Sequence, residues 1–257
     1  MRSAMLGAAL VEVVASFGLQ RQRSGAKPLT MRERATWLQN GAATVLKRIG
    51  IEVMADGNPP RHGLMVSNHL SYLDVLAYAS TMPCAFVAKR EVREWPVFGA
   101  FATMAGTIYV DRERRAANDG AARLIEEALA AGVPVVLFPE GTSSDGGRVL
   151  PFHSSFFEPA IRAGVPVTAS AVGYASSTAD ETALAYHGDD VFGTHLVRTL
   201  GLRGLKARVA FAPAKCYTDR KEAARATHAE VELLRGRVTG RPAIQPTADL
   251  LHLTHAG

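Results

Sequence analysis

Short apolar runs alternate with amphipathic segments along most of the chain after residue 60. Runs with the length and composition of buried strands cover residues 63–67, 84–88, 107–110, 133–138, 165–172 and 207–211. Segments with helical periodicity lie between or after them, at residues 72–82, 95–104, 116–131, 155–163 and 220–238. Strands that alternate with helices predict an α/β fold, with a mainly parallel mixed sheet flanked by helices.

The first 50 residues have a different pattern, which predicts a pair of amphipathic helices. Apolar residues recur at helical spacing between residues 6 and 17. A second helix begins with a capping box, in which Thr30 precedes Glu33 by three residues. Trp37 lies at the apolar edge of this helix, and Gly50 is a suitable stop. The most apolar stretch of the first helix, residues 5–19, is too short to span a bilayer.

Positive charge is concentrated in this N-terminal pair. The whole chain has 29 Lys and Arg, 24 Asp and Glu, and a net charge of +5. Residues 1–50 hold eight of the basic residues and two acidic ones, so the rest of the chain is nearly neutral. Basic amphipathic helices suit an anionic membrane surface. A helical pair packed on the core is the alternative interpretation.

Composition and absent motifs restrict the classes of function. The chain is 47% hydrophobic and 21% charged, as expected of a globular protein. Two cysteines cannot form a disulfide framework. The sequence has no nucleotide-binding glycine motif, no GxSxG and no zinc spacing, and its neutral body argues against nucleic acid. We predict membrane-docking helices at 1–50, a main domain at 51–240 and a flexible tail at 241–257.

Three predicted strands end in polar residues, where parallel sheets bind their ligands. His69 follows the first of these strands, and Asp74 lies five residues further on. A carboxylate that holds one imidazole nitrogen lets the other accept a proton from a hydroxyl. This spacing fits if His69 lies in a turn and Asp74 in the first turn of a helix, with Ser71 as a possible cap. Two unrelated surface residues would give the same pattern.

The other two strand ends could bind an anionic or hydroxylated ligand. Arg112 comes directly after a strand and could present its guanidinium to a phosphate or carboxylate, or pair with Asp111. The third strand runs into residues 138–147, a loop rich in Gly and hydroxyl groups. Gly141 there permits close approach of a ligand, and Glu140 could accept hydrogen bonds from a substrate or hold His69 or Arg112. An ordinary turn is the alternative.

These segments, in this order, resemble the glycerolipid acyltransferase family over roughly residues 60–215. Asn68 through Asp74 is similar to its NHxSxxD block, and the segment from Gly106 to Arg112 is similar to its GxxxxxR block. Residues 138–142 match FPEGT, and residues 165–167 are similar to its VPV block. The resemblance implies acyl transfer from acyl-CoA or acyl carrier protein to a lipid hydroxyl, at the cytoplasmic face of the membrane, with neither metal nor other cofactor.

The resemblance also assigns roles to residues. His69 is the expected general base and Asp74 its orienting partner. The residues expected to bind the acceptor's polar head are Arg112, Glu140, Gly141, Thr142 and Lys89. The expected partners are membrane lipids and the acyl thioester carrier, and the enzyme is expected to be peripheral or monotopic.

One departure from the family pattern bears on the acceptor. Lysophosphatidate enzymes commonly continue FPEGT with Arg and Ser, whereas this chain has Ser143, Ser144 and Asp145. That variant is more similar to enzymes that acylate lyso-ornithine lipid. We expect 1-acylglycerol-3-phosphate as the acceptor, with lyso-ornithine lipid or another lysolipid as the alternative. A thioesterase that activates water with the same His69, and a non-catalytic membrane-binding module, are the hypotheses outside this class.

Overall fold

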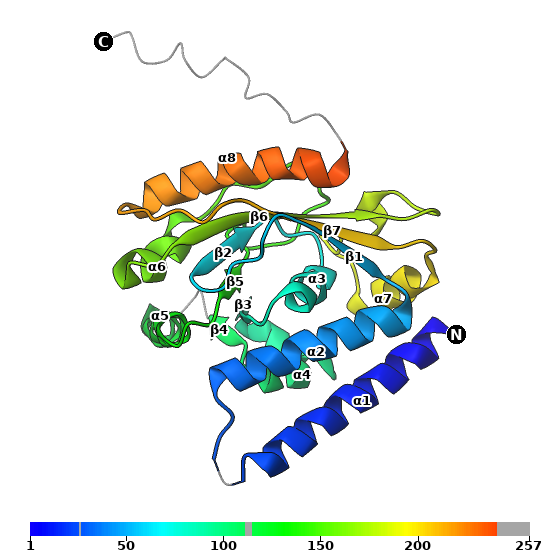
Figure 1. Cartoon of the computed structure of the whole chain (residues 1–257). Helices are drawn as coiled ribbons and strands as arrows, with labels where there is room; N and C mark the ends of the chain where they lie inside the picture. Colours follow the sequence, from blue (N-terminus) through cyan, green and yellow to red (C-terminus); the bar gives the residue numbers. More distant parts are fainter. Residues whose placement is uncertain (26, 111–114, 241–257) are drawn as a thin grey trace.

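A seven-stranded sheet forms the centre of the protein, in a computed structural model that describes residues 1–25, 27–110 and 115–240 (Figure 1). The strands are β1 (Glu52–Asp56), β2 (Leu64–Ser67), β3 (Ala85–Lys89), β4 (Ile108–Val110), β5 (Val135–Leu137), β6 (Val167–Ala175) and β7 (Lys206–Phe211). Their order in the sheet is β1-β7-β6-β2-β5-β3-β4. Every neighbouring pair is parallel except β6 with β7, so the predicted mainly parallel mixed sheet is confirmed.

Helices cover both faces of the sheet. The α-helices are α1 (Arg2–Arg23), α2 (Met31–Ile49), α3 (Leu73–Thr81), α4 (Phe98–Met104), α5 (Arg115–Ala130), α6 (Glu158–Ala163), α7 (Phe192–Gly201) and α8 (Arg220–Thr239). Short 3-10 turns lie at Arg90–Glu94, Ser154–Phe157 and Glu181–Ala183. One face is covered by α8, α6 and α5, and the other by α3 with α1, α2, α4 and α7 outside it (Figure 1).

Alternation along the central strands directs side chains to both layers. Leu64 and Val66 of β2 pack toward α5 and α6, while Met65 packs toward α3. Since all three are 0% exposed, β2 is buried on both faces, as expected of a parallel strand between two helical layers. β1 is different, because it lies at the edge of the sheet and most of its residues are exposed. The pattern of apolar residues did not predict this strand.

α2 belongs to the core, although its sequence also suits a membrane surface. The predicted capping box of Thr30 and Glu33 is present, and Gly50 ends the helix with a left-handed φ of 69°. Trp37, predicted at the apolar edge, is 5% exposed and donates its indole N–H to Ser16 Oγ at 3.0 Å. Its ring stacks on Phe101 with centroids 6.3 Å apart. The N-terminal helices and the domain predicted to begin at residue 51 therefore share one hydrophobic core.

α1 rests on α2 and leaves most of its surface uncovered. It buries only Leu6, Ala9 and Val13. The exposed large hydrophobic residues of this helix and of the position before it are Met1, Met5, Val11, Val14 and Leu19. The helix as formed is longer than the apolar stretch of residues 5–19 that the sequence predicts to be too short to span a bilayer. Among the described helices, α1 is long and apolar enough to cross a membrane, as a signal sequence also is, and 17% of its most apolar stretch is buried.

Half of the eight basic residues in the N-terminal pair join it to other elements or join its two helices. Arg32 donates to the carbonyl of Ala131 at 2.9 Å, just after α5. Arg34 donates to the carbonyl of Thr103 at 3.1 Å, near the end of α4. These guanidinium groups satisfy carbonyls at helix C-termini, where positive charge is favourable. The other two contacts are from Arg2 to the Leu202 carbonyl and from Arg48 to Glu12.

Candidate active site

His69 and Asp74 lie together at the carboxyl end of β2. Nδ1 of His69 is 2.7 Å from Oδ2 of Asp74, and the same oxygen accepts the backbone N–H groups of Leu70 and Ser71 at 2.7 and 3.0 Å. Asp74 therefore fixes the shape of the turn and the orientation of the imidazole together. The Asp74 side chain is 0% exposed and that of His69 is 23% exposed, so solvent reaches the histidine and not its partner.

The imidazole is also held by a ring contact. His69 stacks on Phe138 with ring centroids 4.1 Å apart and planes inclined by 12°. Phe138 follows β5, the neighbour of β2 in the sheet, so the parallel pairing brings the two rings to the same edge. With Nδ1 occupied by Asp74, Nε2 is the nitrogen left to exchange a proton with a ligand.

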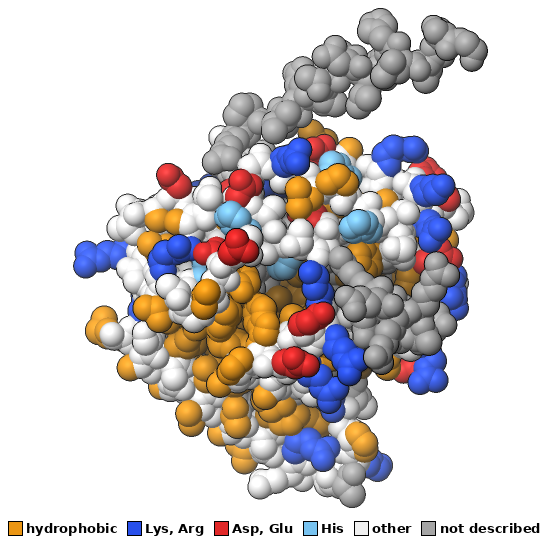
Figure 2. Space-filling view, turned by 180° about the vertical axis from the view of Figure 1, so that it is seen from behind, with side chains coloured by type: hydrophobic (Ala, Val, Ile, Leu, Met, Phe, Trp, Pro, Cys, Tyr) orange, Lys and Arg blue, Asp and Glu red, His pale blue; other side chains and the backbone are white. Residues whose placement is uncertain are grey.

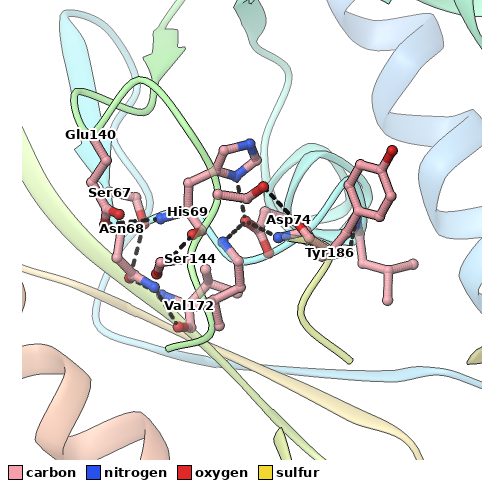
Figure 3. A network of polar contacts seen from close by, with 12 residues as sticks. Ser67, Asn68, His69, Asp74, Glu140, Ser144, Val172 and Tyr186 are labelled. Carbon is pink, nitrogen blue, oxygen red and sulfur yellow. Dashed lines mark hydrogen bonds and ion pairs between the residues drawn. The ribbon is translucent and has the colours of Figure 1, made fainter. Parts of the chain in front are cut away.

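The loop that follows β5 braces the backbone of His69. Glu140 Oε1 accepts the His69 backbone N–H at 3.2 Å, and the Ser144 N–H donates to the His69 carbonyl at 3.0 Å (Figure 3). Gly141, between them, has a φ of 73°, a conformation that glycine adopts without steric cost. The predicted catalytic block and the predicted binding loop thus form one hydrogen-bonded unit.

Glu140 is buried within this unit. It is 4% exposed, and burial raises the pKa of its carboxyl group to about 8 against the opposing effect of the His69 N–H bond. Oε2 of Glu140 has no hydrogen-bond partner in the described part of the protein, which fits a neutral carboxyl group at pH 7. Of the partners that the sequence suggested for Glu140, His69 is the one observed, through its backbone N–H; Arg112 lies outside the described residues.

The remaining predicted binding residues lie around the same edge of the sheet. Lys89 ends β3 and is exposed, and Thr142 is exposed on the loop after β5. β2, β5, β3 and β4 are parallel, so their carboxyl ends point to one edge. Arg112 lies outside the described residues, as does the predicted tail at 241–257. Among the described residues, no group of three or more His, Cys, Asp or Glu side chains is placed to hold a metal ion.

A segment near residue 186, to which the sequence assigned no role, is bonded to the turn that carries His69. The Tyr186 N–H donates to the Leu70 carbonyl at 2.8 Å, and Ser143 Oγ donates to the Tyr186 carbonyl. Tyr186 therefore joins the turn at β2 to the loop after β5, and Figure 3 shows it on the side of Asp74 away from Glu140. The sequence signal for this contact is weak, because both bonds use the Tyr186 backbone.

His195 of α7 holds this segment in place. Its Nε2 lies 3.0 Å from the Ala185 carbonyl, so Nε2 carries the proton and donates. Nδ1 then accepts from the Tyr72 hydroxyl at 3.0 Å. The side chain is buried, and desolvation lowers the pKa of its imidazole. The lowered pKa favours the neutral form, in which each ring nitrogen makes one hydrogen bond. His195 is a structural histidine that connects α7 with the helix bearing Asp74.

Aromatic side chains form a partly buried cluster beside the turn. Phe192 is its centre, with ring centroids 4.9 Å from Tyr72, 4.9 Å from Phe98 and 5.0 Å from Trp95. Val97, between Trp95 and Phe98, has a φ of 67° and is 56% exposed. A β-branched residue rarely adopts this conformation, and here the Phe98 N–H donates to the Pro96 carbonyl at 2.7 Å, closing a tight turn.

Hydrophobic side chains gather around a hollow on one face of the molecule, with histidine side chains above it (Figure 2). Exposed apolar residues near the aromatic cluster are Val97, Val191 and Val197. A polar reactive group at the edge of an apolar surface suits a substrate that has both a polar head and a hydrocarbon chain.

On the opposite side of the turn, Asn68 and Arg235 bind the same carbonyl of β6. Asn68 Nδ2 donates to the Val172 carbonyl at 3.1 Å and Arg235 Nη1 donates to it at 2.7 Å. Arg235 also pairs with Glu181 at 2.9 Å and donates to the Gly146 carbonyl at 2.9 Å. Hence α8 is bonded to β6 and to the end of the loop that braces His69.

Comparisons with known proteins agree with this geometry. The family model described as Acyltransferase matches residues 50–173. The 1-acyl-sn-glycerol-3-phosphate acyltransferase of Neisseria gonorrhoeae is 35% identical over 202 residues, which are 77% of this chain and 76% of that protein. The lyso-ornithine lipid O-acyltransferase of Pseudomonas aeruginosa is 34% identical over 194 residues, 72% of each chain.

A solved structure has the same fold. The crystal structure of the 1-acyl-sn-glycerophosphate acyltransferase PlsC from Thermotoga maritima superposes with a TM-score of 0.67. It covers 94% of this chain and 99% of its own, at 20% sequence identity.

Proposed function

This chain belongs to the glycerolipid acyltransferase family, and we propose that it transfers a fatty acyl group to the free hydroxyl of 1-acylglycerol-3-phosphate, which gives phosphatidic acid. The family membership rests on relatives that match about three quarters of the chain. The observation that carries the catalytic assignment is the 2.7 Å contact between His69 Nδ1 and the buried Asp74, beside a hydrophobic surface.

In the proposed mechanism His69 Nε2 takes the proton from the acceptor hydroxyl as its oxygen attacks the thioester carbonyl. Asp74 holds the ring through Nδ1 and stabilises the imidazolium that forms. The thiol of the carrier then leaves with the proton, and the new ester bond replaces the thioester bond. The donor is acyl-CoA or acyl carrier protein, and the mechanism requires neither a metal nor an enzyme nucleophile.

The acceptor's head is proposed to bind at the edge where β5, β3 and β4 end. Arg112 would supply the main positive charge for a phosphomonoester, which carries about −1.5 to −2 near neutral pH. Lys89 and Thr142, both exposed at this edge, would add a charge and a hydroxyl group. Glu140 and Gly141 would act by shaping the loop, because Glu140 is buried against the His69 backbone.

We propose a position at the cytoplasmic face of the membrane, and the chemistry of the substrates supports contact with a lipid surface. The acceptor and the product are both amphiphiles, and α1 presents exposed apolar residues. We propose that α1 docks the enzyme on the lipid surface as a peripheral or monotopic element. The guanidinium groups of Arg32 and Arg34 are already bonded to carbonyls, so they hold α2 to the protein.

Lyso-ornithine lipid is the second candidate acceptor, because Ser143 stands where lysophosphatidate enzymes commonly have Arg, and the acidic Asp145 follows two residues later. Ser143 is bonded to the Tyr186 carbonyl, and Asp145 Oδ1 accepts the Gly147 N–H at 2.9 Å. The lyso-ornithine head group has both an ammonium and a carboxylate group. Asp145 is exposed and could face such an ammonium group.

An acceptor screen tests the proposed function. The full-length protein, one labelled acyl thioester and a set of lysolipids are incubated, and the products are identified by mass. We expect labelled phosphatidic acid as the main product. Label in free fatty acid alone would identify a thioesterase, and label in ornithine lipid alone would overturn the choice of acceptor.

A pair of substitutions then distinguishes the two head groups. With 1-acylglycerol-3-phosphate, Ser143→Arg should leave kcat/KM unchanged or raise it, since it adds a cation near a phosphate. With lyso-ornithine lipid, Ser143→Arg should repel the ammonium group, and Asp145→Asn should weaken binding while it retains the oxygen that accepts the Gly147 N–H. If Ser143→Arg lowers kcat/KM for 1-acylglycerol-3-phosphate, the proposed head-group site is misplaced.

A further inference from the structure

The Asp74 carboxylate has two oxygens, and a different element holds each of them. Oδ2 faces His69 and the backbone of the turn, whereas Oδ1 accepts the hydroxyl of Tyr174 at 2.6 Å. Tyr174 lies near the end of β6, and its backbone N–H donates to Glu181 at 2.8 Å. The phenol therefore reaches Asp74 from a part of β6 that is held by β7 on one side and by the Glu181 side chain at its backbone N–H.

Tyr174 can act only as a donor in this contact. Its side chain is buried, with the residue 6% exposed, and both burial and the neighbouring Asp74 raise the pKa of its hydroxyl well above the usual value. The phenol therefore keeps its proton near neutral pH and donates a hydrogen bond to Asp74. Since Asp74 is 0% exposed, no water replaces this hydrogen bond if it is lost.

The surrounding charged and titratable groups are accounted for by contacts of their own. Glu181 is paired with Arg235 at 2.9 Å, so the two charges largely offset each other. Tyr78 of α3 is 0% exposed and bonds to Ser67 Oγ at 2.6 Å. Glu140 lies on the far side of the His69 backbone, and burial raises its pKa to about 8. Tyr174 is the group that donates to Oδ1 of Asp74 among the described side chains.

We propose that Tyr174 is a positioning residue for acyl transfer, which fixes the plane of the Asp74 carboxylate and limits how tightly the His69–Asp74 pair holds a proton. This inference rests on the proposed roles of His69 and Asp74. A hydrogen bond donated to a carboxylate spreads its negative charge, so a carboxylate with four donors attracts the imidazolium proton less than one with three. Tyr174 thereby keeps His69 available as a base at lower pH.

The test is the pH dependence of kcat/KM in Tyr174→Phe. The change removes one oxygen and leaves the ring, and Oδ1 of Asp74 becomes a buried acceptor without a partner. We expect the midpoint of the acid limb to rise by about one pH unit, the effect of roughly one hydrogen bond on a carboxylate. The KM for the acceptor should be unchanged, because the phenol bonds to Asp74 inside the protein.

Tyr78→Phe is the matched control. It removes the same hydroxyl from another buried tyrosine in the same region, which bonds to Ser67 and Ser170 and not to Asp74. It should lower Tm by a similar amount and leave the midpoint of the acid limb at the wild-type pH. If both variants move the midpoint equally, or if neither moves it, the inference is wrong.

Two further measurements keep the inference testable if Tyr174→Phe folds poorly. Site-specific 3-fluorotyrosine at position 174 makes the phenol a stronger donor, and it should move the acid limb to lower pH. The low-field proton resonance of His69 Nδ1–H should also shift between the wild-type protein and the protein with 3-fluorotyrosine at position 174. This shift should be seen even without substrate. If that resonance shifts but the His69→Ala variant keeps full activity, the hydrogen bond from Tyr174 is real and the proposed catalytic role of His69 is wrong. If the resonance does not shift, the inference about Tyr174 is wrong.

Discussion

The turn that carries His69 and the helix α1 are held in opposite ways. The turn is held at many points: His69 has contacts at its ring, its N–H and its carbonyl, and both Asp74 oxygens are bonded. α1 buries three side chains and presents apolar residues on its other faces.

The contrast separates two requirements of an enzyme that acts on lipids. Proton transfer needs atoms placed within fractions of an ångström, and a buried network with several partners for each group provides this. Contact with a lipid surface needs apolar area, which has no preferred partner atom. A substitution in one region should leave the other unchanged, so each region serves as the control for the other.

The largest effect is expected in the turn. His69→Ala should lower acyl transfer by at least about 10²-fold, the usual scale of general-base catalysis. Asp74→Asn should be severely impaired as well, because its amide can no longer act as an anionic partner of the imidazole. Vesicle binding of His69→Ala should match that of the wild type because α1 is unchanged, whereas Tm should fall, since the buried Asp74 loses a partner. Circular dichroism should still show a folded protein. Turnover near the wild-type rate in this folded variant would remove His69 from the mechanism.

The next effect concerns Glu140 and pH. Its folded pKa of about 8 is raised by burial above the ordinary value of 4.5, so the folded state retains a proton that the unfolded state has lost. The resulting stabilisation of the folded state is complete below pH 4.5 and is gone above about pH 8. Between these two values the free energy of unfolding falls by about 1.4 kcal/mol per pH unit as the pH rises.

Glu140→Gln provides the comparison for this pH effect. Gln keeps an oxygen that can accept the His69 N–H and has no carboxyl proton to lose. The difference in unfolding free energy between the two proteins should therefore depend on pH between 5 and 8, as measured by denaturant titration. Parallel curves would show that Glu140 is ionised throughout.

The smallest effect is expected within α1, where neighbouring valines have different roles. Val11 is 71% exposed, whereas Val13 is 5% exposed against α2. Val11→Asp should weaken binding to anionic vesicles roughly tenfold, through lost apolar area and charge repulsion, with Tm unchanged. Val13→Ala should cost about 1–2 kcal/mol of unfolding free energy and leave vesicle binding intact. Loss of vesicle binding in the Val13 variant alone would place the docking surface elsewhere.

The sequence predicted those parts of the fold whose signals are local. Six strands and most helices follow from runs of apolar residues, and His69 with Asp74 follows from a short spacing. β1 was missed because Glu52–Asp56 is an exposed edge strand with charged ends. α7 was missed because the helix begins with Phe192 and Gly193, a start without a capping residue.

The contacts that refine the site could not be predicted, because they join distant parts of the chain. Glu140 bonds to the backbone of His69, and a backbone partner leaves no trace in the residue types. Trp37 looked like a membrane anchor because amphipathic helices that pack on another helix and those that meet lipid have the same periodicity. Tyr174 is brought to Asp74 by the pairing of β6 with β2, which depends on the whole sheet.

The edge strand β1 has a consequence for how the protein is made. β1 directly follows the N-terminal helices, and among the described strands its partner is β7, much later in the chain. At roughly 5–20 residues per second, the ribosome presents α1 and α2 many seconds before β7 is complete. During that interval α1 can meet lipid while the sheet still lacks a strand at its edge. If α1 docks on lipid as proposed, the growing chain can meet the membrane before β1 finds its partner in the sheet.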